Sequence, residues 1–186
     1  DTDPSLTVTS DPTFDALSVV EDSGVAGQQT VAITAPTFTA SAVDGYTTGV
    51  SYALAINGGP GTGLATTDGN HPITLVADSA TQISGMFDSD GDTVLDTAAF
   101  TVVLSGSNVT LTSFEALEHV NGPQDTEDDT LDLGSLINVV ATVTVTDGDS
   151  DQVVNSVDAV APLSLTISDT DPSLTVTSDP TFDALS

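Results

Sequence analysis

The sequence has no lysine and no arginine among its 186 residues, although it has 28 aspartate and glutamate residues. The formal net charge is −28, and the only basic side chains that could partner a carboxylate are His71 and His119. Binding of nucleic acid, nucleotide phosphates or an anionic membrane surface depends on Lys and Arg, so this composition argues against all three. Because self-repulsion of this size opposes a compact state, cations must neutralise it, either from a salty medium or as bound divalent ions.

Cysteine is also absent, so neither disulfides nor thiolate metal sites are available. A secreted domain without disulfides needs another staple, and calcium is a natural substitute because aspartate oxygens suit this hard cation. No apolar run approaches the length that crosses a bilayer, so no membrane insertion is expected, and no signal peptide opens the chain. Tryptophan is missing and aromatic residues make up 4% of the chain, which leaves few stacking platforms for sugars.

One stretch occurs twice: Asp1–Ser18 returns without a change at Asp169–Ser186, with a period of 168 residues. An identical copy indicates recent tandem duplication, and the period is domain-sized, unlike the roughly 20–50 residues of a solenoid repeat. We expect one repeat over residues 1–171 and the start of the next, identical repeat over 172–186. Neighbouring identical repeats in the same chain are therefore the expected partners.

Short segments of alternating apolar and polar residues, rich in Thr and Val, predict strands. Residues 100–104 and 109–111 are separated by a short polar segment, which predicts a hairpin. In 141–146, we expect the valines to point inward and Thr142, Thr144 and Thr146 to point outward. The other expected strands are 6–9, 31–34, 50–56, 73–76 and 163–167.

Turn dipeptides separate these strands, and one segment breaks the strand pattern. Thr112–Glu115 has capping-box spacing, and Phe114, Leu117 and Val120 share one helical face, which predicts a short helix near 113–120. Many short strands with regular turns predict an all-β fold, a calcium-stabilised immunoglobulin-like β-sandwich larger than a seven-strand domain. The expected turns are Asp44-Gly45, Asn57-Gly58, Asp68-Gly69 and Asn121-Gly122.

Two aspartate clusters are candidate calcium sites, because alternating carboxylates in a tight turn can supply several of the six to eight oxygens that calcium takes. The first is not an EF-hand loop, because its glycine and its twelfth residue do not fit that pattern. Acidic solvated loops or a polar turn are the alternative. The clusters are Asp88, Asp90, Asp92 and Asp96, and Asp147, Asp149 and Asp151.

The junction between repeats is a third candidate site, with a short extended linker as the alternative. Its motif is Asp-Thr-Asp-Pro, in which proline stiffens the exit and two carboxylates could share an ion with acidic groups of the next unit. The junction carboxylates are Asp1 and Asp3, with their copies Asp169 and Asp171, and the groups expected from the next unit are Glu21 and Asp22.

Catalytic motifs are missing, and no enzyme activity, organic cofactor or small-molecule substrate is expected. The sequence has no Gly-x-Ser-x-Gly elbow, and the glycines of 58–63 lack the lysine of a phosphate loop. His71 is expected in a loop and His119 at a helix end, neither with a chemical role.

The ordered set of segments resembles the large tandem repeat domains of giant RTX adhesins, which are secreted by the type I pathway. This resemblance implies an extracellular β-sandwich on the bacterial surface that folds with calcium and acts as an extender, holding a ligand-binding tip away from the cell. The glycine-rich nonapeptides that give RTX proteins their name are absent, so the chain is not the calcium β-roll region. The segments that carry the resemblance are Gly63-Leu64, Ile73–Leu75, Ala99–Val102, Val109–Leu111, Phe114–His119, Val143–Asp149 and Asp169–Pro172.

Two other functions stay open at this point. Each repeat could itself bind a glycan, ice or a cell-surface ligand, since multivalent binders also repeat. Alternatively, the chain could come from an enzyme or surface-layer domain of a halophile and be acidic for solubility alone, in which case monovalent salt would replace calcium.

Overall fold

The computed structural model describes residues 2–21, 27–118, 130–155, 159–169 and 177. Within these ranges the chain forms fifteen strands and no helix, and hence no helix that could span a membrane. The strands are β1 (Ser5–Val8), β2 (Leu17–Val20), β3 (Gly27–Ala32), β4 (Phe38–Ser41), β5 (Tyr46–Ile56), β6 (Gly61–Ala65), β7 (Pro72–Ser79), β8 (Gln82–Phe87), β9 (Thr97–Ser105), β10 (Asn108–Ser113), β11 (Thr130–Asp132), β12 (Ile137–Asp147), β13 (Gln152–Val154), β14 (Ala159–Pro162) and β15 (Leu165–Ser168).

The strands assemble into three larger sheets and one ribbon. Six strands form the largest sheet, in the order β3-β10-β9-β8-β7-β6, with all neighbours antiparallel. A second sheet has the order β11-β15-β2, in which β15 and β2 run parallel. The third is built on β12, which pairs along its whole length with β5 and, on its other side, with β13 and β14. β1 and β4 form the two-stranded ribbon.

Side chains of the three larger sheets meet in one hydrophobic core. Phe100 and Leu111 of the six-stranded sheet are fully buried, as are Leu165 of β15 and Val139 of β12. Alternation along β12 is complete, with every second residue buried, because one face of this sheet covers the core and the other meets solvent. The all-β prediction is thus confirmed, and the arrangement of more than seven strands is consistent with a β-sandwich.

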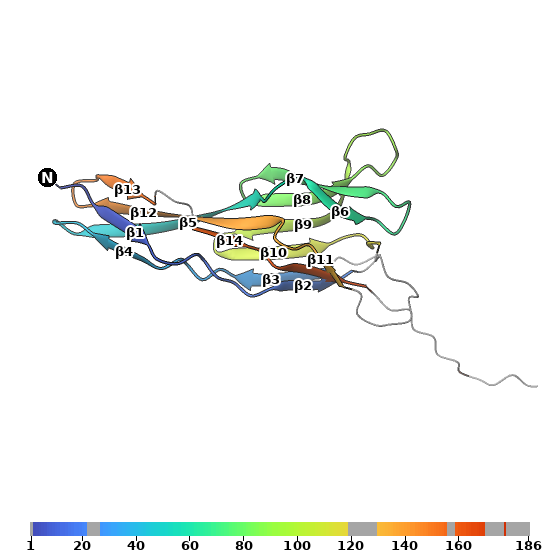
Figure 1. Ribbon diagram of the computed structural model, residues 1–186, viewed down its shortest axis with the longest axis horizontal. Coiled ribbons are helices and arrows are strands. Elements are labelled where there is room, and N and C mark those ends of the chain that lie inside the picture. The colour runs from blue at the N-terminus through green and yellow to red at the C-terminus, as the bar shows by residue number, and fades with distance from the viewer. Residues whose placement is uncertain (1, 22–26, 119–129, 156–158, 170–176, 178–186) are drawn as a thin grey trace, which may run out of the picture.

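The molecule is elongated, with different elements at its two ends (Figure 1). The N-terminus lies beside β1, β4 and β13 at one end, which we name the N-terminal pole; it includes the turns at 42–45 and 148–151. β8 and β15 end at the opposite end, which we name the C-terminal pole, and the loop 88–96 lies there. The two long strands β5 and β12 extend from the N-terminal pole into the sandwich.

The expected helix near 113–120 is wrong for the part that the structure describes. Ser113 is the last residue of β10 and pairs with both Gly27 and Phe100. Leu117 then forms an isolated bridge with Thr66 and is 1% exposed, whereas Phe114 is 40% exposed. Pairing with strands distant in sequence outweighs the local capping signal, and Phe114 and Leu117 do not share a buried face.

Each predicted strand overlaps a strand of the structure, but most predicted segments are too short and several strands are missing from the prediction. The hairpin of β9 and β10, the inward valines of β12 and the turn at Asp44-Gly45 are confirmed. β2, β4, β6, β8, β11, β13 and β14 were not predicted. β8 shows why: four of its six residues are buried, so its sequence does not alternate.

Gly85 of β8 marks the tightest packing in the core. It pairs with Phe100 of β9, whose fully buried ring lies across the place where a side chain would be. A Cβ built on Gly85 would come within 2.5 Å of the ring atom Cζ, closer than non-bonded carbon atoms approach. Glycine is therefore required at position 85, because any side chain there would clash with the Phe100 ring.

We expect Gly85→Ala to lower the free energy of unfolding by about 1–3 kcal/mol, because the fully buried Phe100 ring must shift. The matched control is Gly49→Ala on β5, where no atom lies within 4 Å of the new Cβ and the change should stay within about 0.5 kcal/mol. Urea unfolding followed by circular dichroism measures both; equal stability of the two variants would contradict the packing account.

Candidate metal centre at the N-terminal pole

The turn after β12 places three carboxylates together, and the first of them is buried. Asp147, the last residue of β12, is 7% exposed, because it pairs with Tyr46 at the start of β5. Its backbone N–H donates to the Asp151 carbonyl at 3.1 Å, and its Oδ1 accepts the Asp151 N–H at 2.9 Å. Its second carboxylate oxygen, Oδ2, is buried and has no hydrogen-bond partner. Such an orphaned charge is costly unless something neutralises it.

Asp149 and Asp151 bring two further carboxylates to Asp147. One oxygen from each of the three lies within 4.8 Å of the other two, close enough for a single ion to contact all of them. The pKa of Asp149 is raised, first because a protonated Asp149 would donate a hydrogen bond to the Asp147 carboxyl, and then by desolvation and the charges of Asp147 and Asp151. Without a cation, Asp149 therefore keeps its proton to a higher pH than a free aspartate does.

A fourth carboxylate, which was not among the predicted site residues, reaches the same turn. Asp44 sits in the turn between β4 and β5, and its Oδ2 lies 2.6 Å from the position that a Cβ on Gly148 would occupy. The Asp44 carbonyl oxygen lies 2.9 Å from that position. The sequence identified Asp44-Gly45 only as a turn. Its place beside Gly148 follows from the long register of β5 on β12, which no local signal reports.

The loop 88–96 at the C-terminal pole is built differently. Oxygens of Asp88, Asp90 and Asp92 also lie within 4.8 Å of one another, whereas the fourth predicted member, Asp96, is not in this group. These carboxylates accept hydrogen bonds from the loop itself. Asp88 accepts the N–H groups of Gly91 and Thr93, both at 2.7 Å. Asp90 accepts the N–H of Asp92 at 3.1 Å, and Asp92 accepts that of Val94 at 2.8 Å.

Asp96 closes this loop. Its Oδ1 accepts the Ser89 N–H at 3.1 Å and the Thr97 hydroxyl at 2.9 Å, and its Oδ2 accepts the Ser89 hydroxyl. These bonds, led by the Thr97 hydroxyl, lower the pKa of Asp96. Desolvation would raise the pKa of Asp88, but the N–H groups of Thr93 and Gly91 outweigh it and hold that pKa below its usual value. The loop thus stabilises its own ionised carboxylates.

The structure describes only part of the predicted junction site, so the shared ion there stays a prediction. Asp1, Asp22 and Asp171 lie outside the described residues. Asp3 is exposed at the N-terminal pole, whereas Asp169 follows β15 at the C-terminal pole.

Glu21 belongs to the C-terminal pole of its own repeat. Its N–H donates to the Ser168 carbonyl at 2.8 Å, because β2 and β15 run parallel and end together. Its side chain is 3% exposed and its Oε2 accepts the Leu117 N–H at 2.6 Å. The Glu21 beside Ser168 is thus that of the same repeat, and its carboxylate supports the chain at Leu117. A contact between the junction and the Glu21 of the following unit stays a prediction.

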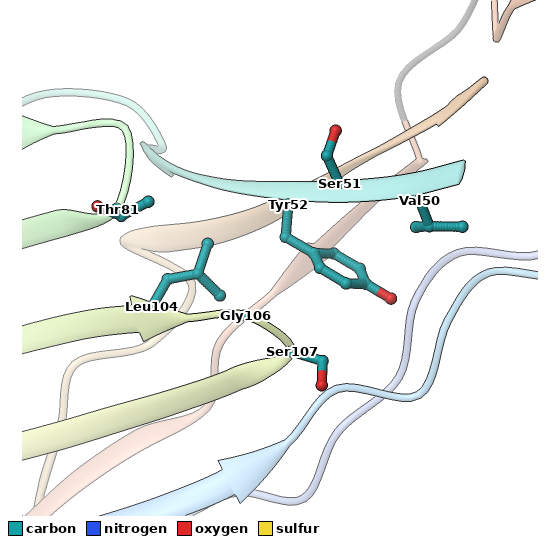
Figure 2. Close-up of a pocket in the computed structure, with 7 residues that line it drawn as sticks. All are labelled: Val50, Ser51, Tyr52, Thr81, Leu104, Gly106 and Ser107. Carbon is teal, nitrogen blue, oxygen red and sulfur yellow. The ribbon is translucent and has the colours of Figure 1, made fainter.

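Cavities outside the acidic turns offer little chemistry. One of about 390 Å³ lies between β5 and the turns at Thr81 and Gly106. Figure 2 shows Val50 and Tyr52 pointing into it and Ser51 pointing to the other side of β5. Tyr52 is the one ionisable residue of its lining, and burial raises the Tyr52 pKa.

The predicted loop residue His71 lines a second cavity, of about 210 Å³, and its ring packs on Phe87 with centroids 5.7 Å apart. This cavity is also lined by Asp68, Ser89 and Glu115. His119 lies outside the described residues.

Comparison with known protein families matches residues 16–160 to a family described as a domain of unknown function, DUF5801. The match covers more than half of the chain, so the chain belongs to this family. No curated protein and no solved structure matches it.

The two acidic clusters should respond oppositely to loss of charge in calcium-free buffer at pH 7. Asp149→Asn should raise the melting temperature, because it removes repulsion and its amide can donate to Asp147 Oδ2. Asp88→Asn should lower it, because the amide cannot accept both the Gly91 and Thr93 N–H groups. Thermal unfolding beside the exposed control Asp15→Asn measures both changes.

Because the pKa of Asp149 is raised and that of Asp88 is lowered, the two groups make the stability of the fold depend on pH in opposite directions. The pKa of Asp149 is raised in the folded chain, so its stabilising contribution is present at low pH and is lost as pH rises through that pKa. The pKa of Asp88 is lowered, so its contribution is present above its usual pKa and is lost as pH falls through the lowered value. A melting temperature that moves in the same direction in Asp149→Asn and Asp88→Asn would contradict these opposite contributions.

Proposed function

We propose that this member of the DUF5801 family is a calcium-binding structural extender, one module of a long repetitive adhesin on the surface of a bacterium. Its role would be to space a ligand-binding tip from the cell. The observation that carries the proposal is the buried Oδ2 of Asp147, which has no hydrogen-bond partner and lies beside two more carboxylates.

A divalent cation is the neutralising partner that the chemistry favours. Burying a carboxylate without a partner costs several kcal/mol, and no Lys or Arg exists anywhere in the chain to offset it. The donors are all oxygens, and calcium prefers oxygen ligands in flexible arrangements. Asp147, Asp149 and Asp151 would hold this ion.

The loop at the C-terminal pole is a second, weaker candidate. Asp88, Asp90 and Asp92 could contact one ion, and one free lone pair on each carboxylate oxygen would suffice. Their N–H bonds already account for the shape of the loop, so this site depends on analogy with the first.

The placement of the termini supports an extender. Asp3 lies at one pole and Asp169 at the other, so successive repeats would follow one another along the long axis (Figure 1). The identical 18-residue copy at 169–186 indicates such an array, and the resemblance to RTX adhesin repeats implies the same organisation. Acidic groups at both ends would repel across each junction unless cations bound there.

Calcium binding of ordinary strength would be sufficient for this role. Extracellular modules bind calcium with dissociation constants of about 0.1–1 mM. At millimolar calcium, a site of about 0.1 mM contributes about 1.4 kcal/mol of stability, and several sites approach the marginal stability of a domain. In cytosol, where calcium is scarce, the sites would be empty and the chain would be easier to export unfolded.

Thermal unfolding in calcium, in EGTA, and in EGTA with high sodium chloride tests the proposal. We expect the melting temperature to fall in EGTA and to stay low when sodium is added, because a screened carboxylate cluster still lacks a ligand for Asp147 Oδ2. Full recovery in sodium alone would indicate a halophilic protein, and a melting temperature independent of calcium would overturn the proposal.

A further inference from the structure

The glycine at position 148 is not explained by the conformation of its own turn. The left-handed residue in this turn is Ser150, with φ of 82°, whereas Gly148 has no positive φ and its backbone would accept any residue. A Cβ at this position would meet the Asp44 side chain at 2.6 Å and the Asp44 carbonyl oxygen at 2.9 Å. What position 148 requires is therefore the absence of a side chain, so that Asp44 can approach.

This approach is unfavourable in the calcium-free chain. Asp44 brings a further negative charge to a turn that already holds Asp147, Asp149 and Asp151. Like charges repel, and the chain has no lysine or arginine to compensate. Close packing of Asp44 on this turn makes physical sense when a cation lies among the carboxylates.

We propose that Asp44 is a further ligand of the metal ion at the N-terminal pole, through its carboxylate and its carbonyl oxygen. The assignment rests on the proposed calcium site and extends it to a second hairpin. Asp147, Asp149 and Asp151 already lie within 4.8 Å of one another, and Asp44 packs on the Gly148 that separates two of them. The Asp44 carboxylate and carbonyl would raise the number of protein oxygens to five, which suits calcium better than the compact octahedron of magnesium.

The consequence is a clamp between two hairpins. Asp44 belongs to the turn between β4 and β5, and Asp147–Asp151 to the turn between β12 and β13. The ion would join these turns where β5 and β12 begin and end their long pairing, at the Tyr46–Asp147 pair. Binding would thereby fix the β1–β4 ribbon to the rest of the N-terminal pole.

Tyr46 makes the site directly observable. The chain has two tyrosines and no tryptophan, and Tyr46 is paired with Asp147, whereas Tyr52 lies about 20 Å further along β5. Terbium takes the same oxygen ligands as calcium, and its luminescence is sensitised by a tyrosine only at short range. Excitation of the full chain at the tyrosine band therefore reports the N-terminal site and not the loop at 88–96. Tyr46→Phe verifies this assignment by removing the signal.

The experiment is titration of terbium, and of calcium in competition, into the full chain and four variants. Asp44→Asn should weaken the apparent affinity about tenfold or more, since even groups that only support a metal ligand cost 10–100-fold. Gly148→Ala should weaken it as well while keeping every carboxylate, because the new Cβ pushes Asp44 away. The double variant should lose little more than Asp44→Asn alone. Asp15→Asn, which removes an exposed charge elsewhere, should bind as the unchanged chain does.

Two failures are distinguishable. If the unchanged chain binds the metal and both Asp44→Asn and Gly148→Ala bind as tightly as Asp15→Asn, Asp44 is not a ligand and this inference is overturned. If the unchanged chain gives no tyrosine-sensitised signal and no calcium competition, the proposed calcium site itself fails.

Discussion

Every carboxylate of this chain must be stabilised without a lysine or an arginine, and the structure is arranged around that constraint. Among the described residues, only Asp78, Asp132 and Asp147 lie within strands, and the other acidic residues occupy turns and loops. The strands can therefore pack an uncharged core between sheets, while the charge collects at their ends. Backbone N–H groups, shared protons and bound cations are the partners that remain available to these ends.

The two acidic clusters use these partners differently, although their sequences look alike. Asp88 and Asp96 are held by N–H and hydroxyl donors of their own loop, which explains the loop's shape without an ion. Asp147 is held on one oxygen only, and its other oxygen is buried by the pairing of β12 with β5. In the proposed function, a cation would therefore be a structural requirement at the N-terminal pole and an option at the C-terminal pole. Because the poles lie at opposite ends of an elongated module, both bear on how successive repeats would meet.

Patterns within short segments of the sequence predicted the strands and turns that depend on residues close together in the chain. The alternation of 141–146 located β12, and the spacing of 100–111 located the hairpin of β9 and β10. The capping-box spacing at Thr112–Glu115 misled, because pairing of Ser113 with two other strands decides that segment. Both aspartate clusters could be found by composition, but the burial of Asp147 and the approach of Asp44 to Gly148 could not. They depend on an eleven-residue register between strands about 90 residues apart, and no local signal encodes that register.

A crystal structure of the chain grown in calcium, with anomalous diffraction to locate the ions, would decide whether the N-terminal pole holds a metal ion. We expect an anomalous peak at the N-terminal pole within coordination distance, about 2.3–2.6 Å, of Asp147 Oδ2, with Asp149 and Asp151 among its ligands. A water molecule or a shared proton at Asp147 Oδ2, with no anomalous peak in saturating calcium, would contradict this expectation.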